Sequence, residues 1–169
     1  MIKITLLLML VSIATYTDMK ENKIKNKYIS LFILLGIVLS LLLGGFSGLK
    51  DSLLGIIVPF LLLFIFFALR MFGAGDIKLF CAIGAIMGVS FVINNIIYSF
   101  LLAGIVVILK LLFTKKIIST FKGIYYYFAN MFLTQSVSEF ESTTNDKFPF
   151  AIAILLGTIF QIIIGYKFI

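Results

Sequence analysis

Long apolar runs recur along nearly the whole chain, and no other feature of the sequence restricts its fold as strongly. Of the 169 residues, 62% are hydrophobic and only 12% are charged, and the mean hydropathy is +1.21. One water-soluble core of this size cannot hide so much apolar surface. Because a segment in lipid must satisfy its own backbone hydrogen bonds, these runs predict membrane-spanning α-helices.

Six of the runs are interpreted as the spans of an all-α membrane protein. They form a single polytopic domain over residues 1–169, with short uncharged turns expected at 44–48 and at Asn94 and Asn95. The expected spans are residues 4–17, 28–44, 53–69, 77–93, 96–113 and 148–166.

Two features of these runs allow alternative interpretations. The first run could also be a cleavable signal peptide, because residues 12–14 (Ser-Ile-Ala) resemble a small-residue cleavage site. Gly84 and Gly88, four residues apart, are typical of a face that another helix approaches closely, but small residues are also common in membrane helices generally.

The longest polar interruption covers residues 114–147. Apolar residues recur at helical spacing between Ile117 and Phe132, which predicts an amphipathic helix on the cytoplasmic surface, between the fifth and sixth spans. Residues 134–146 are expected to form a flexible acidic loop.

The basic residues are divided unequally between the two sides of the membrane. If the spans alternate, the segments at 18–27, 70–78 and 110–147 lie on one side and carry most of the 14 lysines and arginines. The positive-inside rule makes that side cytoplasmic, which predicts a multi-pass plasma-membrane protein with both termini outside. The net charge of +7 is then explained by topology and by attraction to membrane lipids, and it requires no nucleic-acid partner. The cations on the basic side are Lys20, Lys23, Lys25, Lys27, Arg70, Lys78, Lys110, Lys115, Lys116, Lys122 and Lys147.

The chain contains no histidine and a single cysteine, Cys81. These absences exclude a serine–histidine hydrolase, a His-Glu-x-x-His zinc site and a paired-thiol metal site. No metal or cofactor is expected, and any hydrolytic chemistry would depend on carboxylates.

A glycine-flanked carboxylate stands between two apolar runs, in the sequence Gly-Ala-Gly-Asp-Ile-Lys-Leu at residues 73–79. Carboxylates at membrane depth are rare and usually mark functional sites. Gly73 and Gly75 allow the backbone to leave helical geometry before Asp76, and they leave room for another chain. Asp76 would then begin a helix, where the positive dipole end favours its ionised form. The alternative is that Asp76 only caps that helix.

Asp18 and Asp76 are expected on the same face of the membrane, because two crossings separate them. Asp51 is expected on the opposite face. Two carboxylates that meet in a partly desolvated site share one proton and can hydrolyse a peptide bond by acid–base catalysis. The alternative for Asp18 is a solvated loop residue.

The chain resembles the type IV prepilin peptidase family of Gly-x-Gly-Asp intramembrane aspartyl proteases, in its short form of about six spans. Asp18 followed by residues 24–26 (Ile-Lys-Asn) resembles the first catalytic aspartate and a downstream Ile-Pro-Asn element. Residues 73–79 match the second aspartate motif, and residues 147–151 (Lys-Phe-Pro-Phe-Ala) resemble the element that opens the last helix.

The resemblance implies an aspartic endopeptidase that cleaves the basic leader of pilin-like precursors at the cytoplasmic membrane boundary. Lys25 stands where the family usually has proline, which predicts a less rigid loop after Asp18. The chain lacks the Cys-x-x-Cys domain of the longer members, so N-methyltransferase activity is not expected. The implied catalytic residues are Asp18 and Asp76, with support from Gly73, Gly75, Lys78, Asn26 and Pro149.

A basic leader must approach a lysine-rich face, which repels it. Glu139, Glu141 and Asp146 are hypothesised to receive the leader's basic side chains, the alternative being a solvated linker. Lys78 either points toward the carboxylates or extends to the lipid headgroups, and the second orientation is favoured.

Two other functions would also place acids at this depth. The first is a small transporter or assembly scaffold in which Asp18 and Asp76 bind a cation or relay protons, although the inverted repeats of many transporters are not visible. The second is a presenilin-like protease, which shares the Gly-x-Gly-Asp element but does not explain Asp18 at the end of a span.

Overall fold

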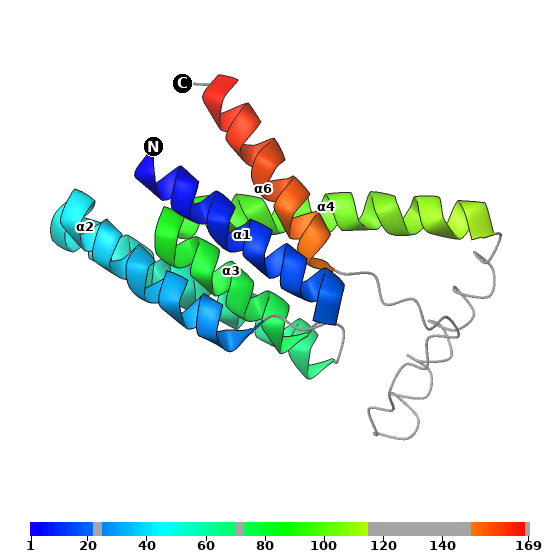
Figure 1. Cartoon of the computed structure of the whole chain (residues 1–169), viewed down its shortest axis with the longest axis horizontal. Coiled ribbons are helices and arrows are strands. Elements are labelled where there is room, and N and C mark those ends of the chain that lie inside the picture. Colours follow the sequence, from blue (N-terminus) through cyan, green and yellow to red (C-terminus); the bar gives the residue numbers. More distant parts are fainter. Residues whose placement is uncertain (22–24, 70–72, 115–149, 168–169) are drawn as a thin grey trace. The chain divides into compact units, whose positions relative to one another are not determined.

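The structure is a computed structural model that describes residues 1–21, 25–69, 73–114 and 150–167, and all regular elements in these ranges are α-helices (Figure 1). The chain divides into two compact units, residues 1–102 with 148–169 and residues 103–147. Of the second unit, the described part is the end of one helix. The helices are α1 (Ile2–Glu21), α2 (Asn26–Ala68), α3 (Ala74–Met87), α4 (Val89–Thr114) and α6 (Phe150–Lys167).

Three of the described helices are long and apolar enough to cross a membrane, namely α1, α2 and the Val89–Leu109 part of α4. This agrees with the expected all-α membrane class. Helix α3 has only 14 residues, about 21 Å of rise, which is less than the ~30 Å of a hydrocarbon core. The count of six spans therefore stays a prediction. Outside the described residues lie the predicted amphipathic helix, Pro149, Glu139, Glu141 and Asp146.

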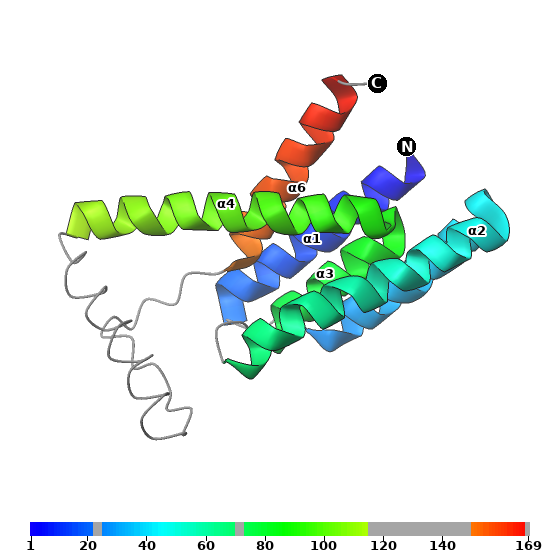
Figure 2. The same cartoon turned by 180° about the vertical axis from the view of Figure 1, so that it is seen from behind.

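Helix α2 is a helical hairpin. Gly45 has φ 57° and ψ −144°, a conformation that glycine adopts without strain, and it separates limbs at residues 26–44 and 46–68. The two limbs lie side by side in both views (Figures 1 and 2). Gly48 contacts the Ser40 carbonyl oxygen, which joins the limbs next to the turn. The reversal falls within the turn expected at residues 44–48.

Helix α3 packs between the two limbs of α2. The Ser40 and Ser52 hydroxyls, one from each limb, donate hydrogen bonds to the Ala85 carbonyl oxygen at 3.3 and 2.7 Å. The backbones of Gly55 and Gly84 approach so closely that a Cβ atom on either would overlap the other. Gly84 therefore has the close-packing role that its spacing predicts.

The turn expected at Asn94 and Asn95 is wrong. Helix α3 ends instead at Gly88, whose φ of 93° breaks the helix, and α4 begins at Val89. The Asp51 carboxylate accepts a hydrogen bond from the Val89 amide at 3.1 Å and satisfies the start of α4. Asn95 belongs to the middle of α4 and is fully buried. Its side-chain amide donates a hydrogen bond to the Thr158 hydroxyl of α6.

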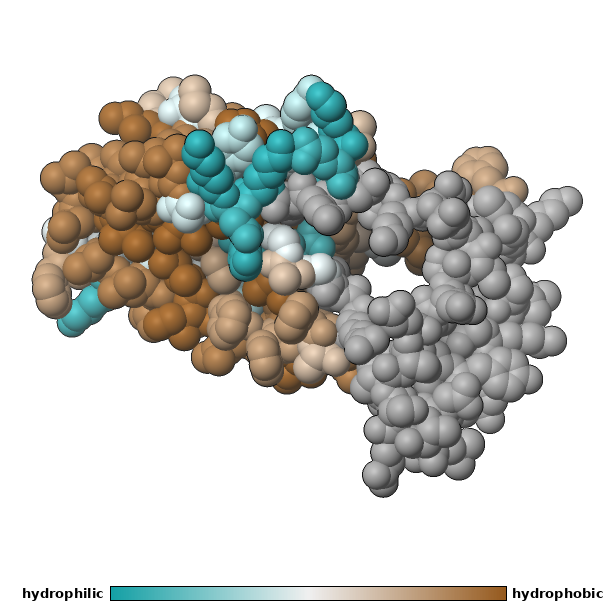
Figure 3. Space-filling view, turned by 60° about the horizontal axis from the view of Figure 1, so that its bottom comes forward, coloured by the Kyte–Doolittle hydropathy of each residue, from teal (hydrophilic) through white to brown (hydrophobic). Residues whose placement is uncertain are grey.

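Large apolar side chains cover the outer surface of these helices. Leu42, Leu61 and Ile65 of α2 are 74%, 61% and 64% exposed. Figure 3 shows one face that is hydrophobic over most of its described area, with most of the hydrophilic side chains gathered in one region. Such a surface suits helices that face lipid.

Candidate active site

Four helix ends lie together at one end of the first unit: the last turn of α1 and the first turns of α2, α3 and α6 (Figures 1 and 2). They carry Asp18, Asn26, Asp76 and Ala151, respectively. Three of the four are helix N-termini, whose unpaired amides and positive dipole ends favour negative charge. The sequence thus provides a polarised environment for carboxylates at this end of the bundle.

Asp76 is the third residue of α3 and is half-buried. Its carboxylate turns back toward Gly73, the residue that caps the helix, and the Asp76 amide donates a hydrogen bond to the Gly73 carbonyl oxygen at 3.1 Å. Gly73 has extended angles (φ −74°, ψ 143°), and a Cβ there would lie 3.3 Å from Asp76 Oδ2. Gly73 therefore leaves room for the carboxylate.

The Asp76 carboxyl precedes the apolar run that begins at Ile77. Burial, and after it the nearby charge of Asp18, raise the pKa of Asp76 to about 6, against the smaller opposing effect of the Gly73 backbone. Asp18 and Asp76 are thus close enough for one charge to disfavour the other. This environment keeps Asp76 protonated at a pH where a solvated carboxyl is ionised.

Asp18 is half-buried near the end of α1 and faces the start of α6. Its Oδ2 atom accepts a long hydrogen bond, 3.4 Å, from the Ala151 amide. One turn earlier, the buried Thr15 hydroxyl lies 3.1 Å from the Ala151 carbonyl oxygen and 2.8 Å from that of Val11. Both backbone groups of Ala151 thus contact α1, which aligns the first turn of α6 with Asp18.

Aromatic side chains of α3 and α4 also pack against the first turn of α6. The Phe150 ring lies 6.4 Å from the Phe80 ring of α3 and 5.8 Å from the Phe100 ring of α4, measured between centroids. Such tilted pairs add to the free energy of burial. Thr15 and Phe80 were not among the sequence-predicted site residues. No sequence signal singles out either residue, because their contacts join segments far apart in the chain.

Lys78 is exposed and does not contact the carboxylates. Its Nζ atom donates a hydrogen bond to Asn26 Oδ1 at 3.0 Å. Two predicted support residues thus contact each other and link the first turns of α2 and α3. Gly75 lies half-buried in the first turn of α3, between the cap and Asp76.

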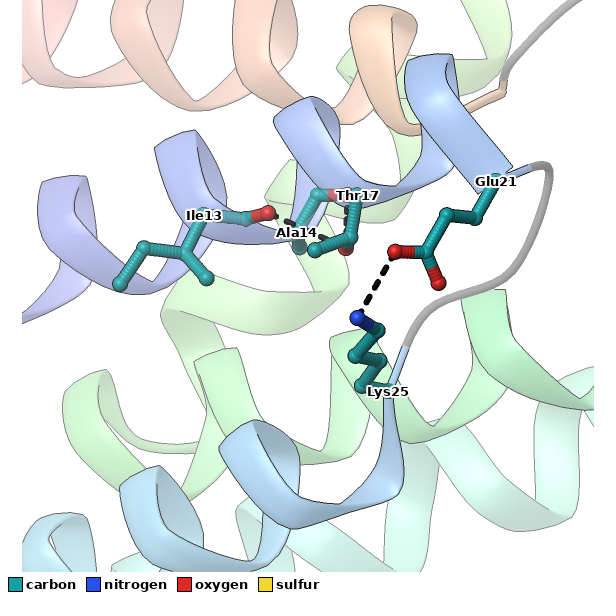
Figure 4. A network of polar contacts seen from close by, with 5 residues as sticks. All are labelled: Ile13, Ala14, Thr17, Glu21 and Lys25. Carbon is teal, nitrogen blue, oxygen red and sulfur yellow. Dashed lines mark hydrogen bonds and ion pairs between the residues drawn. The ribbon is translucent and has the colours of Figure 1, made fainter.

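Lys25, the residue that replaces the family's proline, forms an ion pair with Glu21 at 2.7 Å between Nζ and Oε1 (Figure 4). Both side chains are about half exposed, so the pair contributes little to stability. It borders a cavity of about 370 Å³ between α1 and the start of α2. Neither Asp18 nor Asp76 lines this cavity, which is therefore distinct from the carboxylate pair. Its lining residues are Ser12, Ile13, Tyr16, Thr17, Lys20, Glu21, Lys25 and Tyr28.

Among the described residues, no group of three histidine, cysteine, aspartate or glutamate side chains is placed to hold a metal ion. What the carboxylates can do chemically is acid–base work on a water molecule. One can hold a proton while the other is ionised.

The sequence profile of the type IV leader peptidase family matches residues 5–108, more than half of the chain. The chain belongs to the type IV leader peptidase family. The match includes Asp18, Asn26 and the 73–79 motif, and it ends before α6. Comparisons with curated proteins and with solved structures gave no significant match. Leader peptidase membership makes the chain a protease at the level of the family and confirms the resemblance inferred from the sequence.

Proposed function

We propose that this leader peptidase is an aspartic endopeptidase that removes the basic leader from pilin-like precursors, with Asp18 and Asp76 as its catalytic residues. The observation that carries the proposal is the electrostatic interaction of two half-buried carboxylates where four helix ends meet. Membership in the leader peptidase family supplies the reaction class.

In the proposed reaction the pair holds a single proton, which Asp76 carries in the resting enzyme because its pKa is raised. Ionised Asp18 removes a proton from a water molecule as the water oxygen attacks the scissile carbonyl. Protonated Asp76 donates a hydrogen bond to the carbonyl oxygen. When the tetrahedral intermediate breaks down, the proton on Asp18 passes to the leaving amine, and the pair returns to its starting state.

The remaining site residues have supporting roles in this proposal. Gly73 and Gly75 keep the backbone beside Asp76 slim enough for a substrate chain. The Lys78–Asn26 hydrogen bond braces the starts of α3 and α2. Pro149 keeps the supporting role that the family resemblance implies, and the Ala151 amide of α6 contacts Asp18.

The proposal includes the membrane arrangement that the charges predict. Six spans and a surface amphipathic helix form one domain in the plasma membrane, with the carboxylates on the cytoplasmic side. Cleavage then occurs where the basic leader meets the apolar helix of the precursor. N-methylation of the product is not part of the proposed activity.

The test is co-expression with a pilin-like precursor, followed by a gel assay for leader removal. Asp18→Asn and Asp76→Asn should each reduce processing at least about 100-fold, since each removes one acid–base group. Asp51→Asn is the matched control, because it makes the same change at a carboxylate of α2 that contacts the start of α4. Processing that survives either active-site change, at normal protein levels in the membrane, would remove that residue from the mechanism.

The acidic residues Glu139, Glu141 and Asp146 are proposed to receive the leader's basic side chains. Reversing all three to lysine should raise the apparent KM for a basic leader and leave kcat nearly unchanged, because only capture is weakened. An unchanged KM, measured with the purified enzyme at low salt, would dismiss this role.

A further inference from the structure

A row of buried polar side chains lies between α4 and α6, away from the carboxylates. Asn95 and Ser99 of α4 and Thr158 of α6 are 0% exposed, and Gln161 of α6 is 8% exposed. Polar groups between membrane helices are retained where they pair across the interface. We therefore compared the hydrogen-bonding capacity of these four side chains with the partners that they have.

Two interhelical hydrogen bonds order this row. The Asn95 amide nitrogen donates to Thr158 Oγ1 at 3.0 Å, and the Gln161 amide nitrogen donates to the Phe91 carbonyl oxygen at 3.0 Å. Phe91 and Asn95 are one turn apart on α4, and Ser99 is the next turn. Ser99 also faces α6, since a Cβ at Gly157 would lie 2.6 Å from its Oγ atom.

Three atoms of this row have no hydrogen-bond partner among the described residues: Asn95 Oδ1, Gln161 Oε1 and Ser99 Oγ. Each such atom destabilises the fold when it stays unpaired in a buried site.

Exchanging the oxygen and nitrogen of either amide does not remove the deficit. The Thr158 hydroxyl already donates to the Ile154 carbonyl oxygen at 2.8 Å, so it can accept from Asn95 but cannot donate to it. An exchanged Gln161 would set its oxygen against the Phe91 carbonyl oxygen. Both amide oxygens therefore need a donor that the described side chains do not supply.

The three unpaired atoms are two acceptors and one hydroxyl, which can act as a donor. One water molecule has the complementary set, two O–H donors and an acceptor. A cation suits the row less well, because none of the four side chains is charged and a buried ion without a counter-charge is costly.

We propose that the interface between α4 and α6 binds one internal water molecule, which donates to Asn95 Oδ1 and Gln161 Oε1 and accepts from the Ser99 hydroxyl. The water extends the interhelical bonding to Ser99, one further turn of α4. It thereby helps to hold α6, whose first turn contacts Asp18. The site does not depend on the peptidase chemistry.

The test is a double-mutant cycle on Ser99→Ala and Gln161→Met, with the Tm of the purified full-length protein as the readout. Each single change should lower the Tm by about 2–4 °C, since it removes one ligand of the water. The double variant should lose no more than the larger single loss, because the water is already gone. The control cycle pairs Gln161→Met with Ser52→Ala, whose hydroxyl is buried in the α2–α3 contact, and its shifts should add. Additive shifts for Ser99 and Gln161 would overturn the proposal.

Two further measurements distinguish a bound water molecule from a dry contact and from a bound cation. In bilayers, solid-state NMR should show magnetisation transfer from water to the Asn95 side-chain amide, and its absence would mean a dry contact between side chains and overturn the proposal. The Tm should be equal in sodium chloride and choline chloride at the same ionic strength. Stabilisation by sodium alone would replace the water with a cation and overturn the assignment.

Discussion

Glycine at position 73 is explained by the space that its missing side chain leaves for the Asp76 carboxylate, and not by its backbone angles. The sequence predicted that glycine frees the backbone before Asp76, yet the observed angles are open to any residue, and the space is used by the carboxylate itself. Topology predicted that Asp18 and Asp76 share one end of the molecule. The Thr15–Ala151 and Asn26–Lys78 contacts were not predictable, because they depend on how each helix is rotated about its axis.

The raised pKa of Asp76 predicts how stability depends on pH. The folded protein holds the proton of Asp76 up to a pH of about 6, whereas the unfolded chain releases it near 3.8. The folded state thus binds more protons in this window, so its stability falls as the pH rises through it. Above pH 6, where Asp76 is ionised in the folded protein, its burial lowers the free energy of unfolding by up to about 3 kcal/mol.

Asp76→Asn removes this cost, since an amide does not ionise. The variant should be more stable than the wild type above pH 6, and the gain should vanish below about pH 4. Chemical unfolding of both proteins in a mild detergent, at several pH values between 4 and 7.5, measures the difference. A gain that is the same at every pH would show that Asp76 is not held protonated by its surroundings.

At the level of the helices, apolar length and turn composition predicted both limbs of α2 and the reversal between them. The same reasoning placed the next turn at Asn94 and Asn95, whereas the chain turns at Gly88. Gly88 stands four residues after Gly84, so the pair resembled a packing face. The hydrogen bond from the Val89 amide at the start of α4 to the Asp51 carboxylate of α2 joins residues 38 positions apart. Such a contact leaves no local signal in the sequence.

The contact between α2 and α3 predicts a sharp difference between two glycines of α2. Gly55→Ala should lower the free energy of unfolding by about 1–3 kcal/mol or more, because its methyl group overlaps the Gly84 backbone. Gly44→Ala is the matched control, since nothing lies within 4 Å of its Cβ position. It should be neutral or stabilising by up to about 1 kcal/mol. Equal denaturation midpoints for the two variants would contradict the close approach of the helices.

For the whole molecule, the long continuous apolar runs predicted the helical membrane class, because a helix of that length satisfies its own backbone hydrogen bonds in lipid. The charge pattern also predicted an orientation, which cysteine labelling can measure. Cys81 is only 5% exposed and gives little background. Lys27 and Ser47 are exposed, near the start of α2 and just after its reversal, respectively.

A membrane-impermeant maleimide should label Ser47→Cys in intact cells and Lys27→Cys only in inside-out vesicles, because the basic side is expected to be cytoplasmic. Gel-shift detection of the labelled protein gives the result directly. Labelling of Lys27→Cys from outside would reverse the orientation and separate the carboxylates from the cytoplasmic boundary.

The hairpin around α3 gives the two carboxylates unequal freedom. Helix α3 packs against both limbs of α2, whereas α1 makes far fewer contacts with its neighbours. Asp76 consequently stands on the more densely packed helix of the two. If the proposed site binds a peptide, we expect Asp18, together with Thr15 and Ala151, to adjust more than Asp76 does.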